Sequence, residues 1–118
     1  MCSGKPLRRN KEMCYEFSFF FDWGSGTCLW STNDKAIEKY DYPVDINQLP
    51  ISASLKEQLM LMTDTHDEAL DWDNPAGELL WDNEQKGQFI SDAVELYHQL
   101  CQELGHEYKI ELKRDLLI

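Results

Sequence analysis

The chain has 118 residues, of which 42% are hydrophobic, so it is long enough for one domain with a real core and too short for two. Its formal net charge is −11, from 22 acidic and 11 basic side chains. This acidity disfavours nucleic-acid phosphates and anionic membranes as partners. It favours basic proteins or cations, although solubility alone is a common reason for a low isoelectric point.

The first residues differ in charge from the rest. Residues 1–12 hold four basic side chains among Gly, Pro and Asn residues, namely Lys5, Arg8, Arg9 and Lys11. We expect them to form a flexible basic arm, with residues 13–118 as a single domain. The start lacks the apolar run of a secretory signal, and no segment reaches the roughly 18 apolar residues of a membrane helix. These patterns predict a cytoplasmic protein without membrane partners.

The first regular element is a strand from Met13 to Trp23. Four aromatic side chains alternate along it, at Tyr15, Phe17, Phe19 and Phe21. Gly24 and Gly26 follow and supply the positive φ angles of a tight hairpin. We therefore expect Thr27–Ser31 to return beside the first strand.

Helical patterns dominate the rest of the chain. A short helix is predicted to start within Thr32-Asn33-Asp34 and stop before Pro43, and a long one to run from Ser54 to near Trp72. A second long helix is predicted from Asn83 to Leu104, closed by Gly105. Residues 106–113 alternate as a strand, which we expect beside the first. The resulting class is α+β: an antiparallel sheet of about three to four strands, with two long helices and one short helix mainly on one face.

The segment Asp64–Glu84 concentrates the negative charge, with eight acidic residues and no Lys or Arg. It also holds two tryptophans, each followed by Asp-Asn, on either side of the turn Asn74–Gly77. Clustered acids around indole rings suit a surface that binds a basic protein. The candidate partner-binding residues are Asp67, Glu68, Asp71, Trp72, Asp73, Trp81, Asp82 and Glu84. The alternative is that both rings pack beneath the turn and the acids only keep it soluble.

The sequence offers no catalytic, metal or cofactor motif. A calcium-binding loop starting at Asp71 would place Pro75 at its fifth position and Ala76 where glycine is required. The glycines at 24 and 26 lack the lysine of a phosphate-binding loop. No histidine lies at zinc spacing from a cysteine, and His66 reads as a half-buried, hydrogen-bonded side chain. The four scattered cysteines favour reduced thiols over disulfides. We predict no catalytic residues, no metal and no cofactor, hence not an enzyme.

Several short motifs between Cys28 and Gly105 resemble a group of small acidic bacterial proteins. These motifs are Leu29-Trp30-Ser31 with Asn33-Asp34, Tyr42-Pro43-Val44, Leu49-Pro50 with Ser52, Leu70-Asp71-Trp72, and Pro75 with Trp81. Some proteins of this kind are immunity proteins of contact-dependent or other polymorphic toxin systems. The resemblance implies a toxin-neutralising role and transfers no active-site residues.

Three functions follow from these patterns. The first is an immunity protein that occludes a basic toxin, with a nuclease as the expected activity, and acts as a monomer rather than a dimer. The second is a secretion-chaperone-like acidic binding module, which would need a dimer with an exposed apolar groove. The third is an undescribed enzyme, which would need a deep pocket with converging His, Asp or Glu side chains.

Overall fold

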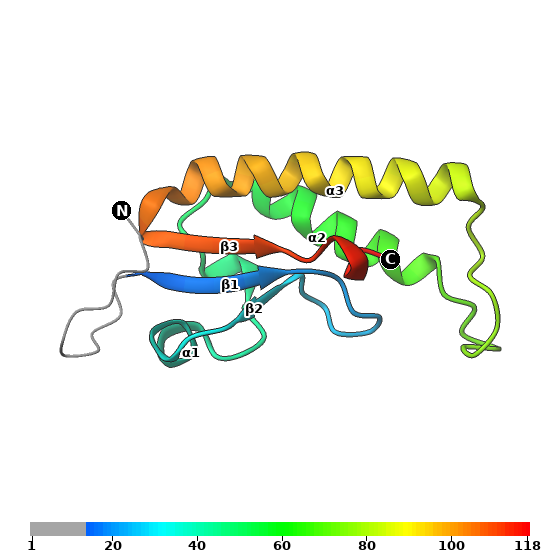
Figure 1. Ribbon diagram of the computed structural model, residues 1–118, viewed down its shortest axis with the longest axis horizontal. Coiled ribbons are helices and arrows are strands. Elements are labelled where there is room, and N and C mark those ends of the chain that lie inside the picture. Colours follow the sequence, from blue (N-terminus) through cyan, green and yellow to red (C-terminus); the bar gives the residue numbers. More distant parts are fainter. Residues whose placement is uncertain (1–13) are drawn as a thin grey trace.

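A computed structural model describes residues 14–118 of the protein (Figure 1), so the basic arm expected at 1–12 lies outside the described residues. The elements are β1 (Tyr15–Phe19), β2 (Leu29–Ser31), α1 (Asp34–Tyr40), α2 (Ala53–Glu68), α3 (Asn83–Leu104) and β3 (Tyr108–Leu112). Three short 3-10 helices lie at Ile46–Gln48, Gly105–Glu107 and Arg114–Leu116. The α+β class, with one short and two long helices, is confirmed.

The sheet has three strands in the order β2-β1-β3. β1 runs antiparallel to β2, with Phe19 opposite Leu29, and parallel to β3, with Phe19 opposite Leu112. The prediction of a purely antiparallel sheet was therefore wrong for the β1–β3 pair. Alternation of side chains is the same for both strand directions, so the pattern alone could not decide. The two long helices between β2 and β3 supply the long connection that parallel pairing requires.

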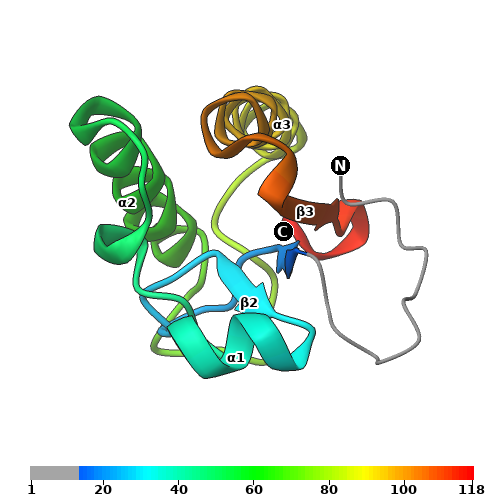
Figure 2. The same ribbon diagram turned by 90° about the vertical axis from the view of Figure 1, so that its left-hand side faces the viewer.

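The helices pack mainly against one face of the sheet, which is lined by Phe17 and Phe19 of β1 and extended by Phe21 just beyond the strand. Their rings each contact a different helix: Phe17 lies 5.6 Å from Tyr40 of α1, Phe19 5.8 Å from Tyr97 of α3, and Phe21 5.2 Å from His66 of α2. Figure 2 shows α2 and α3 side by side, with α1 next to β2. This aromatic face is the centre of the core.

The helix starts follow side-chain caps. α1 starts within the predicted stretch Thr32-Asn33-Asp34, and Asn33 is its cap, because its side chain accepts a hydrogen bond from the Ala36 N–H. The start of α2 was predicted two residues late: Ser52, not Ser54, is the cap, and its Oγ accepts from the Leu55 N–H at 3.2 Å. Ser52 also donates from its N–H and its Oγ to the carboxylate of Glu103, at 2.7 and 3.0 Å. These two bonds tie the start of α2 to the end of α3.

The observed ends of α2 and α3 can be compared with the predicted ones. α2 ends at Glu68, earlier than predicted, where the carbonyl of Ala69 accepts the N–H of Leu80 at 2.8 Å. α3 has the predicted bounds, and Gly105 ends it with a φ of 78°. Its buried residues follow helical spacing: Phe89, Ala93, Leu96, Leu100 and Leu104.

Candidate functional site

The predicted binding residues lie at one end of the molecule, on the last turn of α2, the connection to α3 and the first turn of α3 (Figure 1). We call residues 67–84 the acidic corner. The β1–β2 hairpin forms two hydrogen bonds of 2.9 Å there, one to the corner and one to His66, the residue before it. Trp23 Nε1 donates to the carbonyl of His66, and the Gly24 N–H donates to Oδ1 of Asp67. The corner is therefore held by the sheet as well as by the helices.

Trp72 is the most exposed large aromatic side chain of the corner. Its exposed fraction is 57%. Its indole Nε1 nevertheless donates to the carbonyl of Asp67 at 2.9 Å, and its ring edge lies 3.7 Å from where a Cβ on Gly24 would sit. Gly24 has a φ of 79°, a conformation that favours glycine. The ring is thus fixed in orientation while most of its surface faces solvent.

Trp81 occupies a different environment. It is half-buried, and its ring lies 5.2 Å from that of Phe89, a core residue of α3. One part of the indole therefore belongs to the packing beneath the helix and another part reaches the surface. The two tryptophans, which look equivalent in the sequence, divide into an exposed and a half-buried one.

The six carboxylates of the predicted set also divide into two groups. Glu68, Asp73 and Glu84 are exposed side chains. Asp67 and Asp71 instead accept backbone N–H bonds, from Gly24 and from Asp73. Asp82 caps α3, because its Oδ1 accepts a hydrogen bond from the Gln85 N–H at 2.8 Å. In the reverse direction, the Asp82 N–H donates to Oε1 of Gln85. Three of the six carboxylates therefore hold the backbone of the corner by hydrogen bonds in addition to contributing negative charge.

His66 lies directly beneath the corner and is only 1% exposed, rather than half-buried as its sequence pattern suggested. Its ring stacks on Trp23 at 4.5 Å and on Phe21 at 5.2 Å. Within the described residues, Nε2 has no hydrogen-bond partner. Burial lowers the pKa of His66, and the nearby carboxylates of Asp67 and Asp22 only partly oppose that effect. The imidazole is thus a neutral packing group at neutral pH.

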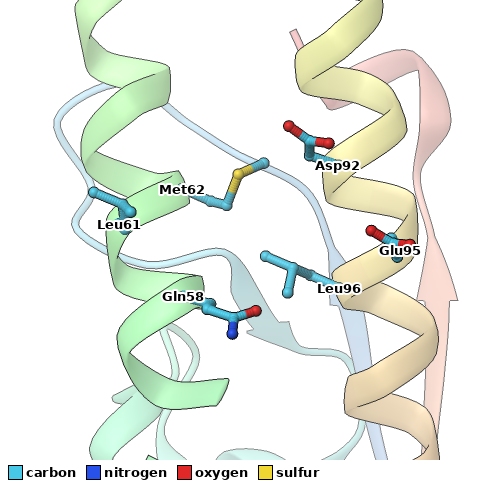
Figure 3. Close-up of a pocket in the computed structure, with 6 residues that line it drawn as sticks. All are labelled: Gln58, Leu61, Met62, Asp92, Glu95 and Leu96. Atoms are coloured by element: carbon cyan, nitrogen blue, oxygen red, sulfur yellow. The ribbon is translucent and has the colours of Figure 1, made fainter. Parts of the chain in front are cut away.

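A groove between α2 and α3 adjoins the corner, and this groove was not predicted from the sequence. One part, of about 220 Å³, is lined by Gln58, Leu61, Met62, Asp92, Glu95 and Leu96 (Figure 3). A wider part, of about 460 Å³, shares Leu61, Met62 and Asp92 and extends to Glu68 and Trp81. The available signal was Leu61, an apolar residue outside the stripe that α2 buries, and it is 65% exposed.

The remaining reactive side chains bear on the enzyme alternative. Within the described residues, Cys28 and Cys101 are free thiols, as expected for reduced cysteines. Burial raises the pKa of the Cys28 thiol to about 12, so the thiolate needed for nucleophilic attack does not form at neutral pH.

Across residues 14–118, no three His, Cys, Asp or Glu side chains are grouped so that they could hold a metal ion. Over the same span, none of the helices combines the length and the apolar character needed to cross a membrane.

Most of the chain matches the sequence model of a known protein family. Residues 18–115 match the sequence model of a family described as Serratia CdiI immunity protein-like. The matched stretch contains α1, α2 and α3, β2 and β3, and therefore both the acidic corner and the groove. No curated protein matches the chain.

Proposed function

Because the chain belongs to this family of CdiI-like immunity proteins, we propose that it neutralises a basic toxin by covering the toxin's active site with the acidic corner. An immunity protein acts by binding its cognate toxin. The activity we expect of the toxin is that of a nuclease, because a nuclease binds phosphates with basic side chains and so presents a surface complementary to carboxylates.

The observation that carries the proposal is the exposed, oriented indole of Trp72 among carboxylates. Tryptophan is enriched among residues that dominate binding energy, since its large ring loses much water contact and little conformational freedom on binding. The hydrogen bond to the carbonyl of Asp67 already fixes the ring. The surrounding acids would steer a basic partner towards it and speed association at low salt.

The proposal includes the state in which the protein acts. We expect a monomer in the cytoplasm, without a cofactor, because the toxin of a contact-dependent system acts inside the cell that it enters. The net charge of −11 supports a basic partner and opposes self-association through the corner.

The test is to mix the protein with the toxin domain encoded directly upstream and measure binding by calorimetry and toxin activity in the same samples. Trp72→Ala combined with Asp73→Ala should weaken the complex about 30-fold or more, because the central ring and an adjacent charge are lost. Both side chains are exposed, so folding should be unchanged.

A matched control removes one acid and one aromatic ring elsewhere. Glu38→Ala combined with Tyr42→Ala changes two exposed residues outside the acidic corner, and Tyr42 is 53% exposed. This variant should bind and protect like the wild type. Equal binding by both double variants would contradict the acidic corner as the contact surface, and absence of any complex would contradict the toxin assignment itself.

A further inference from the structure

We infer that the groove between α2 and α3 binds a basic amphipathic segment of the toxin, in addition to the contacts made by the acidic corner. The inference rests on the proposed function and deepens it, because it names the chemistry of a second element of the partner. That element carries an apolar side chain flanked by Lys or Arg.

The first support is the apolar floor of the groove. Met62 of α2 and Leu96 of α3 point towards each other across it (Figure 3). Leu61 stands on the α2 rim with 65% of its surface exposed. Scattered apolar residues on a surface need no explanation, but here the exposed leucine adjoins a hollow with the half-buried Met62 and the buried Leu96 at its base. Such a hollow accepts an apolar side chain from outside.

The second support is the charge of the lining. The charged residues that line the two parts of the groove are all acidic: Glu68, Asp92 and Glu95. Asp92 and Glu95 stand one turn apart on α3, so they can pair with basic side chains on a segment that lies along the groove. A second copy of this chain, with a net charge of −11, is a poor occupant because its acids would meet those of the rim.

The third support is position. Glu68 and Trp81 belong both to the acidic corner and to the wider part of the groove. A toxin seated on the corner therefore already lies next to the groove. Because the groove is open and bounded by two helices, it suits a helix or an extended segment placed along it better than an enclosed small molecule.

The test compares neighbouring positions on α2 in the complex with the toxin domain encoded upstream. Leu61→Asp should weaken binding about tenfold or more, because it places a charge where an apolar contact is made. Met60→Asp is the matched control: Met60 is the preceding residue, is 43% exposed and does not line the groove. It should bind within about twofold of the wild type.

A second pair of variants tests the charge. Asp92→Lys with Glu95→Lys should lower the association rate about tenfold and reduce its salt dependence. Glu38→Lys with Glu107→Lys makes the same change in net charge at exposed positions away from the groove, and should have a much smaller effect. Equal effects of the two pairs would show that only the overall charge matters, and would overturn the inference.

The outcomes separate this inference from the proposed function. If the wild type binds the toxin and both groove variants bind as tightly as their controls, the groove inference is wrong and the corner proposal stands. If the wild type forms no complex, both fail. Sedimentation of the free protein covers the other occupant: a dimer that Leu61→Asp dissociates would make the groove a contact between two copies, as in the chaperone alternative, and would overturn the inference.

Discussion

The aromatic face of the sheet and the surface formed by the groove and the acidic corner use similar side chains for different ends. On the sheet, Phe17, Phe19 and Phe21 are at most 5% exposed and join the sheet to the three helices. On the other surface, Leu61 and Trp72 are 65% and 57% exposed. The difference shows that a small domain can complete its core and still keep large apolar side chains in contact with water, where only a partner can bury them.

The largest effect that would sharpen this comparison is expected in the core. Phe19→Ala should lower the free energy of unfolding by about 3–5 kcal/mol, because it leaves a cavity between the sheet and α3. Leu61→Ala should change it by less than about 0.5 kcal/mol, since the side chain is mostly hydrated already. Denaturant unfolding of both variants measures the contrast. Comparable losses would mean that Leu61 also supports the fold.

A smaller effect is expected at Asp82, which belongs to both the fold and the corner. Asp82→Ala should destabilise the protein by about 1 kcal/mol, because the N-cap of α3 is lost. Asp82→Asn keeps a capping oxygen and should retain most of the stability while removing the charge. Unfolding and toxin affinity measured on both variants separate the two roles. A stability loss in Asp82→Asn as large as in Asp82→Ala would show that the charge, rather than the cap, supports the fold.

The smallest expected effect is a change of the free energy of unfolding with pH. Burial holds the pKa of His66 below the 6.5 of an exposed imidazole, so the unfolded chain binds a proton more readily than the folded one. The free energy of unfolding should therefore be retained above about pH 6.5 and fall as the pH drops below it. His66→Leu should flatten this dependence, whereas His98→Gln, a change at an exposed histidine, should keep it. Denaturant unfolding between about pH 7.5 and 5.5 measures the slope; an unchanged slope in His66→Leu would contradict this origin.

Local patterns predicted most elements of the fold. The bounds of α3, the cap at Asn33 and the positive φ angles at Gly24 and Gly26 all depend on neighbouring residues, so the sequence could reveal them. The direction of β3 depends on how the chain returns through α2 and α3, which no local pattern records. The choice of Ser52 over Ser54 as a cap coincides with Glu103, 51 positions away, bonding to Ser52.

The candidate site was predictable in composition and less so in geometry. The sequence placed the acids and the two tryptophans on one segment, but not the exposure of Trp72 or the contact of Trp81 with Phe89. The capping role of Asp82 could have been inferred from Gln85 three residues later. The groove could not, because in its narrower part the lining residues of the two helices are 30 or more positions apart and meet only through the packing of α2 against α3.

The bonds between Ser52 and Glu103 have a consequence for how this protein can diversify. They join the start of α2 to the end of α3, and Leu55 and Leu100 near these ends are buried in the core cluster. Rim residues such as Leu61 and Glu95 can therefore vary while the scaffold stays the same, much as loops vary on a constant framework in other recognition proteins. Exchange of surface side chains alone can therefore adapt the binding surface to a toxin whose sequence has changed.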